Sequence, residues 1–267
     1  MKIRKTELIG RLRLDSEWLY GLNPVREALR AGRNIKCIFI SYRRKDSVKE
    51  IKELAEKKEI PVIFKDAVFF DSRFKKGHQG IAAEVHHKEY TTLNEMLEIP
   101  FSNKEIPLFL IIDCLEDPRN LGAILRVADA AGVHGIVLQS HRSVTLSSEV
   151  SKVSAGAVEY VPVTMVSNIK HAINKMKETG IMIIGAEAES DKEFWQIDFI
   201  QPLAIVIGSE GKGIRKTVSE KCDIIVRIPM FGRINSLNVS VATGIILFEI
   251  LRQRIFNNEK NKEIMRK

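Results

Sequence analysis

Short apolar runs that alternate with helical patterns constrain the fold of this chain more than any other feature. Residues 109–115 read FLIIDCL, and similar runs follow at 135–140, 181–188 and 203–210. Continuously apolar strands are typical of parallel sheets that are covered on both faces. Residues 120–131 carry apolar side chains at the spacing of one helical face. The pattern predicts an α/β fold whose parallel strands are joined by right-handed crossovers.

A smaller α/β pattern precedes this series. Asn23 and Pro24 are expected to supply a helix cap and a first helical residue, and Gly32 to end that helix. A capping box at Ser47 and Glu50 predicts the start of a second helix. The expected strands are residues 37–41, 61–65 and 81–85.

The length of 267 residues suits two domains. We expect residues 1–17 to be an N-terminal extension and residues 18–88 to be the small α/β domain. Residues 89–106 carry little strand pattern and two turn-like breaks, which predicts a linker. Residues 107–267 would then form the larger parallel-sheet domain.

Composition excludes several classes of protein. No run of about 18 apolar residues suggests a membrane span, and the basic N-terminus lacks the apolar core of a secretion signal. The three cysteines lie far apart without a CxxC pair. This usage predicts a reducing, cytoplasmic location, with neither disulfides nor a metal site.

The net charge of +8 is unevenly placed. Residues 1–105 hold 22 Lys and Arg against 16 Asp and Glu, and the remainder holds 20 against 18. Six of the eight excess charges therefore lie in the first portion. Charge alone leaves two interpretations open, a solubilising surface or a module that binds a polyanion such as RNA.

Residues 228–251 combine an apolar run with a polar entrance. Their second half predicts a buried helix, yet Asn235, Ser236, Asn238 and Ser240 crowd its start. One cap requires one such residue. Several hydrogen-bonding groups beside apolar side chains instead favour a pocket for a small amphipathic ligand.

Two further segments could carry chemistry. The turn GSEGKG, residues 208–213, follows an apolar strand directly, where ligands of open parallel sheets bind. It matches neither the dinucleotide fingerprint nor the phosphate-loop motif, so a simple tight turn is the alternative. Asn120 and Arg126 project from the helix that follows residue 117. Gly122 and Asp129 are expected on the face opposite the Leu and Ile stripe.

The three segments, in this order, resemble the SpoU/TrmH family of RNA ribose 2′-O-methyltransferases, a branch of the SPOUT superfamily. The first motif of that family, Asn-x-Gly-x-x-x-Arg, matches Asn120, Gly122 and Arg126. The second, G-x-E-G-x-G, matches residues 208–213. The third matches Ile228-Pro229-Met230 together with residues 236–242. Residues 18–88 resemble the substrate-binding domain of the family, which is similar to an RNA-binding ribosomal protein fold.

The resemblance implies a SPOUT domain with a deep trefoil knot, a homodimer formed by that domain, and S-adenosylmethionine as cofactor. It implies cofactor contacts from Gly208, Ile228, Met230 and Leu237. The implied catalytic residues are Asn120, Arg126, Glu210, Ser236 and Asn238, and Ser240 would cap the last helix. Arg126 would act either as the base or as a phosphate clamp, with Glu210 as an alternative proton acceptor.

The most similar family members methylate a guanosine ribose in 23S ribosomal RNA, and a transfer RNA ribose is the alternative substrate. Two other classes stay open on residues alone. A non-catalytic RNA-binding protein on this fold would be expected to lack the set of Asn120, Arg126 and Glu210, which is present. A dinucleotide-dependent enzyme would require the fingerprint, which is absent.

Overall fold

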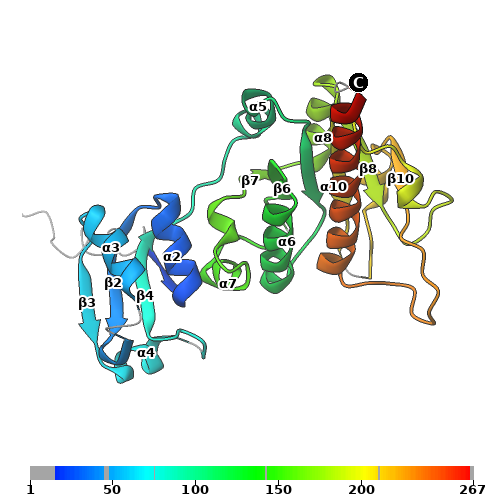
Figure 1. Ribbon diagram of the computed structural model, residues 1–267. Coiled ribbons are helices and arrows are strands. Elements are labelled where there is room, and N and C mark those ends of the chain that lie inside the picture. The colour runs from blue at the N-terminus through cyan, green and yellow to red at the C-terminus, as the bar shows by residue number, and fades with distance from the viewer. Residues whose placement is uncertain (1–15, 45–47, 75, 142, 210, 265–267) are drawn as a thin grey trace, which may run out of the picture. The chain divides into compact units, whose positions relative to one another are not determined.

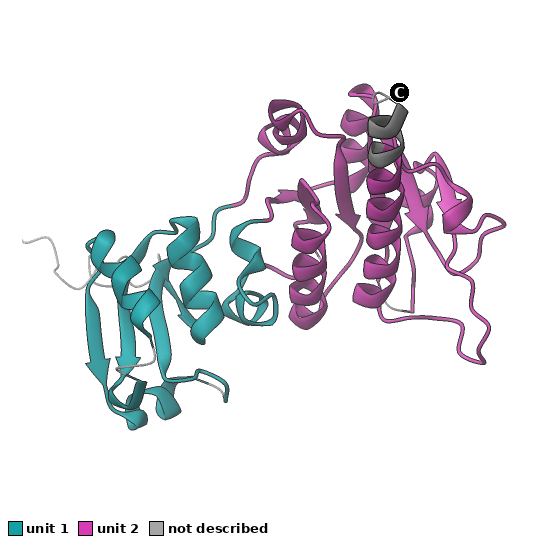
Figure 2. Ribbon diagram, in the orientation of Figure 1, with its two compact units in different colours: residues 1–89, 146–160 teal, residues 90–145, 161–267 magenta. Residues whose placement is uncertain are grey.

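The computed structural model describes residues 16–264, except residues 45–47, 75, 142 and 210 (Figure 1). It divides into two compact units (Figure 2). Unit 1 consists of residues 1–89 and 146–160, and unit 2 consists of residues 90–145 and 161–267. The chain therefore passes between the units three times, because a segment from the middle of the sequence folds with the N-terminal part.

Unit 1 is built on a four-stranded sheet of order β1-β4-β2-β3. β4 pairs antiparallel with both β1 and β2, and β2 pairs parallel with β3. One face is covered by α2 and α3, and the other carries an aromatic cluster beside α4. The elements are β1 (Ser16–Tyr20), α2 (Leu22–Ala31), β2 (Ile35–Ser41), η1 (Tyr42–Arg44), α3 (Lys49–Lys57), β3 (Val62–Lys65), α4 (Ala67–Arg73), β4 (Ile81–His86), α7 (Ser148–Val153) and η2 (Ala157–Glu159).

The expected strands of unit 1 are confirmed, and one expected cap is wrong. Gly32 ends α2 in the left-handed conformation, as expected, but the residue that caps its start is Gly21. Asn23 and Pro24 lie inside the first turn instead. The capping box at Ser47 lies outside the described residues.

A buried ion-pair network ties the inserted segment 146–160 to the rest of unit 1. The guanidinium of Arg33 is 6% exposed and pairs with Glu17 and with Glu159, whose side chain is 1% exposed. Arg33 also donates to the carbonyl oxygen of His86. The ammonium of Lys88 donates to the carbonyl oxygen of Glu159, and burial lowers the pKa of Lys88. A charge this deeply buried is stable only with its partners, so unit 1 requires both of its chain segments.

Unit 2 is a six-stranded, fully parallel sheet of order β10-β8-β9-β5-β6-β7. The expected α/β class is therefore confirmed. Its elements are α5 (Leu93–Asn103), β5 (Leu108–Ile112), α6 (Pro118–Ala130), β6 (Gly135–Gln139), β7 (Val163–Val166), α8 (Ile169–Glu178), β8 (Met182–Ala186), η3 (Phe194–Gln196), β9 (Leu203–Ile207), α9 (Lys216–Ser219), β10 (Ile224–Val226) and α10 (Val239–Ile264).

Helices cover both faces of this sheet, as the continuously apolar strands predicted (Figure 1). Phe109 and Ile111 of β5 pack with α5, α8 and α9 in one apolar cluster. The alternate residues of β5 point to the opposite face, where α6 packs against α10. The described helices include none that is long and apolar enough to cross a bilayer.

The segment 89–106, which was expected to be a linker, contains helix α5. Thr92 and Glu95 form a capping box at its start, and Met96 and Leu97 are buried in the core of unit 2. The turn-like break at Pro100 lies inside this helix. Packing of the two apolar side chains outweighs the weak helical pattern, so these residues belong to the fold of unit 2.

We predict that Glu159→Ala destabilises unit 1 by about 3 kcal/mol, because it leaves the buried Arg33 with one carboxylate fewer. Urea unfolding should be followed through the fluorescence of Trp18 of β1 in a Trp195→Phe background. Glu50→Ala is the matched control, since the Arg30–Glu50 pair is exposed and should contribute less than about 1 kcal/mol. Equal losses in the two variants would contradict the importance of the buried network.

Candidate functional site

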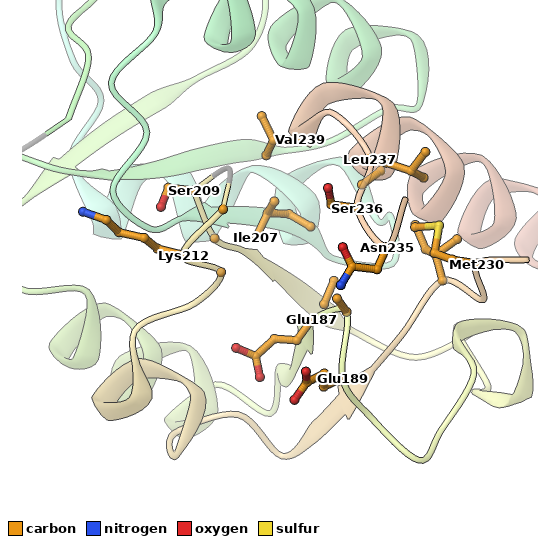
Figure 3. A pocket seen from close by; sticks show the side chains of 17 residues that line it. Glu187, Glu189, Ile207, Ser209, Lys212, Met230, Asn235, Ser236, Leu237 and Val239 are labelled. Carbon is orange, nitrogen blue, oxygen red and sulfur yellow. The ribbon is translucent and has the colours of Figure 1, made fainter. Parts of the chain in front are cut away.

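One cavity lies beyond the carboxyl ends of three adjacent strands, β9, β8 and β10 (Figure 3). Its volume of about 570 Å³ is within the range of small-molecule sites. The segments that follow these strands line it, together with the start of α10. The lining residues are Ala186, Glu187, Ala188, Glu189, Ile207, Gly208, Ser209, Gly211, Lys212, Gly213, Ile228, Met230, Asn235, Ser236, Leu237, Val239 and Ala242.

The glycine turn after β9 is folded back on itself so tightly that its first residue cannot carry a side chain. A Cβ placed on Gly208 would lie 2.0 Å from the carbonyl carbon of Gly213. The amide of Gly213 donates to the carbonyl oxygen of Ser209 at 3.0 Å, and Gly211 and Gly213 have positive φ. The turn thus presents backbone to the cavity at close range. Glu210, an expected catalytic residue, lies outside the described residues.

A buried ion pair fixes the end of this turn. Asp113, directly after β5, is fully buried and accepts hydrogen bonds from three donor groups of Arg215. These come from the backbone amide at 2.9 Å, from Nε at 2.9 Å and from Nη2 at 2.6 Å. The Asp113 carboxylate raises the pKa of Arg215. The Asp113–Arg215 pair joins the end of β5 to the residues that follow the glycine turn. It therefore restrains the part of the cavity wall that this turn forms.

The third motif meets the first through two asparagines. The side-chain amide of Asn238 donates to Oδ1 of Asn120 at 3.0 Å. Oδ1 of Asn238 accepts from the backbone amide of Ser240 at 2.9 Å and from its hydroxyl at 2.6 Å. Asn238 therefore caps α10. The expectation that Ser240 would cap it is wrong, since Ser240 lies in the first turn and donates to the cap.

The expected site residues do not all share the cavity. Gly208, Ile228, Met230 and Leu237, all expected to contact the cofactor, line it together with Ser236. Asn120 and Asn238 are linked to each other beside it.

Arg126 is exposed on α6 and is not among the lining residues. Gly122 is buried, which contradicts its expected position opposite the apolar stripe, because the small residue lies on the covered face of α6.

Several residues at the site were not expected from the sequence. Glu187 and Glu189 line the cavity, and Asp113 and Arg215 fix the end of the glycine turn that forms part of its wall. One signal could have indicated Asp113, since it is a lone carboxylate at the end of an otherwise apolar strand, where parallel sheets place ligand sites. Nothing in the residue pattern singles out Glu187 or Arg215, because their partners are distant in sequence.

Comparison with known proteins defines the class. The SpoU rRNA Methylase family model matches residues 107–248. A second model, for the RNA 2′-O ribose methyltransferase substrate-binding domain, matches residues 18–91. The chain belongs to the SpoU rRNA methylase family, which confirms the resemblance found in its motifs.

Individual relatives match over nearly their full length. The chain is 40% identical to a putative TrmH family tRNA/rRNA methyltransferase of Bacillus subtilis, over 89% of this chain and 96% of the relative. It is 40% identical to the 23S rRNA (guanosine-2′-O-)-methyltransferase of Pseudomonas aeruginosa, over 90% and 98%. The SpoU methyltransferase AviRb of Streptomyces viridochromogenes, solved in complex with AdoMet, matches with a TM-score of 0.77 and 25% identity, over 92% and 93%.

We predict that Gly208→Ala weakens binding of S-adenosylmethionine at least tenfold, about 1.4 kcal/mol, because the new methyl group would collide with the backbone of Gly213 and distort the turn that lines the cavity. Gly232→Ala is the matched control, since the nearest atom to a Cβ there is 4.0 Å away and φ is not positive. Isothermal calorimetry of both variants measures the two affinities. A Gly208→Ala protein that binds as tightly as the control variant would show that this turn is not part of the pocket.

Proposed function

We propose that this protein transfers the methyl group of S-adenosylmethionine to the ribose 2′-hydroxyl of a guanosine in 23S ribosomal RNA. The observation that carries the proposal is the cavity at the carboxyl ends of β8, β9 and β10, in which the second and third family motifs meet. The relative from Pseudomonas aeruginosa, named for this reaction, covers 90% of the chain. The absence of a membrane-spanning helix among the described residues is compatible with work on cytoplasmic ribosomes.

The cavity has walls that suit S-adenosylmethionine. Gly208 lines the cavity with backbone alone, which favours hydrogen bonding to an adenine or ribose edge. Ile228, Met230 and Leu237 supply apolar surface against which a purine ring can pack. The bound cofactor supplies an electrophilic methyl group on a sulfonium. The family's trefoil knot belongs to this proposal and would bring residues 235–237 and the glycine turn to one cavity.

The chain must align the attacking oxygen and accept its proton. Ser236 lies on the cavity wall, and the hydrogen bond between Asn120 and Asn238 fixes two amides beside it. These groups can orient a ribose hydroxyl for in-line attack, which lowers the barrier by positioning. The side chain of Arg126 has no hydrogen bond or ion pair with any other described residue. We assign it to binding the phosphate next to the target ribose, because a guanidinium forms bidentate hydrogen bonds with phosphate and rarely releases its proton.

Unit 1 would hold the RNA outside the reaction centre. Six of the eight excess positive charges lie in residues 1–105, and residues 18–91 match the substrate-binding model. Phosphate contacts from lysine and arginine give affinity that falls with salt. A transfer RNA remains the second candidate substrate, since the Bacillus subtilis relative is named for either RNA.

We propose that two copies pair through helix α10, as the family resemblance suggests. Val241, Ile245, Phe248 and Ile255 follow a helical spacing that places them on one side of the helix, and all four are exposed, Phe248 and Ile255 by 50% each. This face was expected to be buried. Exposed apolar stripes of this kind mark protein interfaces, and a second copy of the chain would cover it.

The methyl-transfer proposal predicts labelled 2′-O-methylguanosine when 23S rRNA transcripts are incubated with the protein and labelled S-adenosylmethionine. Arg126→Ala should cut transfer at least a hundredfold, because it removes the clamp on the phosphate, and should leave cofactor affinity within twofold. Nuclease mapping of the product identifies the modified ribose. Modification of transfer RNA alone would support the second candidate, and a wild-type rate for Arg126→Ala would contradict the role of that arginine.

The dimer proposal predicts that Phe248→Asp raises the dissociation constant of the dimer at least tenfold, because it places a charge in the apolar face of α10. Sedimentation of the full chain measures this constant. Phe101→Asp is the matched control, since Phe101 is a similarly exposed aromatic residue, 49% exposed, on α5 of the same unit. A monomeric wild-type protein would rule the interface out.

A further inference from the structure

Glu187 is a half-buried carboxylate on the wall of the cavity. It follows β8 directly, and its backbone amide donates to the carbonyl oxygen of Val226 at 2.9 Å. The hydroxyl of Ser219 donates to its Oε2 at 3.2 Å. The backbone and one hydroxyl therefore hold this side chain in place. Glu189, two residues later, is exposed on the same wall (Figure 3).

Glu187 has no cationic partner among the residues that the structure describes. Among the described residues, no Lys, Arg or His forms an ion pair with it. Lys212 lines the cavity, but its ammonium points away from both glutamates in Figure 3. Glu187 also lines an adjoining hollow together with Lys216, but the two side chains form no ion pair. The buried carboxylates of Asp113 and Glu159 differ, because each of them faces an arginine.

The negative charge of Glu187 acts on its surroundings. The pKa of the Cys222 thiol is raised to about 12, first by burial and then by the charge of Glu187. This thiol stays neutral at physiological pH and offers no compensation. A half-buried charge without a cationic partner lowers the free energy of any cation that enters the adjacent cavity, since the local dielectric constant is below that of water.

The two forms of the cofactor differ in charge. S-adenosylmethionine has a sulfonium, an ammonium and a carboxylate, so it carries one net positive charge. Methyl transfer breaks the bond from sulfur to the methyl carbon and forms a bond from that carbon to the ribose oxygen, which loses its proton. The electron pair remains on sulfur, so the product, S-adenosylhomocysteine, has no net charge.

We propose that Glu187 makes this pocket selective for the cationic cofactor over its neutral product, so that the spent cofactor is released readily. This inference rests on the proposed function, because it requires S-adenosylmethionine in the cavity. Glu189 adds to the same field, more weakly because water screens it. The two ligands share their adenosine and their amino acid end. A contact of Glu187 with the ribose or with the ammonium would therefore strengthen binding of both ligands, whereas attraction of its charge to the sulfonium strengthens binding of S-adenosylmethionine alone.

Calorimetric titration of the full-length protein with each of the two ligands tests the inference. The wild type should bind S-adenosylmethionine more tightly than S-adenosylhomocysteine. Added salt should reduce this difference in affinity, because it screens the charge of Glu187. Glu187→Gln should weaken the binding of S-adenosylmethionine about tenfold and should change the affinity for S-adenosylhomocysteine less than twofold. Glu189→Gln should act in the same direction with a smaller effect. Glu98→Gln, at an exposed position on α5, changes the net charge equally and should alter neither affinity.

The outcomes separate the two proposals. Retained binding of S-adenosylhomocysteine by Glu187→Gln demonstrates that the variant is folded. If Glu187→Gln weakened binding of both ligands equally, Glu187 would contact a part that the two ligands share and would not select by charge. If neither affinity changed, Glu187 would have no role in ligand recognition. A wild type that binds the two ligands equally would also overturn the inference while leaving the proposed function standing. A wild type that binds neither ligand would refute the proposed function itself.

Discussion

The ion pair between Asp113 and Arg215 is the interaction on which the candidate site depends. A carboxylate without solvent contact is costly unless its partner and hydrogen bonds compensate for the lost hydration. Arg215 does so with its backbone amide and its guanidinium together. Because one of these donors is backbone, the pair restrains the chain and not only a side chain. The glycine turn therefore ends at a position set by the central strand of the sheet.

From this anchor the cavity follows by geometry. β9 lies beside β5, and β8 and β10 follow outward in the same sheet, all pointing the same way. Their carboxyl ends share one edge, so the segments after them gather there. Gly208 lets the turn close without a side chain in the way. The start of α10 completes the enclosure and is capped by Asn238, whose other side-chain atom reaches the first motif.

Much of the fold could be predicted from the sequence, because the central strands are apolar on both faces and their pattern is unambiguous. The strands that were missed, β1 and β7, lie at sheet edges, where fewer apolar residues are required. Helix α5 was missed because Pro100 suggests a helix break. The helix forms nevertheless, because tertiary packing of its apolar side chains stabilises it. At the site, motifs indicated the glycine turn and the polar entrance to α10. The roles of Asp113, Arg215 and Glu187 depend on neighbours that only the folded chain brings together.

The discontinuous make-up of unit 1 has a consequence for biosynthesis. Residues 1–89 emerge from the ribosome first, and the segment that carries Glu159 emerges about 70 residues later. At the usual elongation rate of about 5–20 residues per second, this delay lasts roughly 4–14 s. During that interval Arg33 lacks one of its carboxylates, and the nascent N-terminal part waits while β5 and β6, two of the six strands of the neighbouring sheet, are translated. Unit 1 is thus the first unit to begin synthesis, but it cannot complete its fold until part of unit 2 has been synthesised.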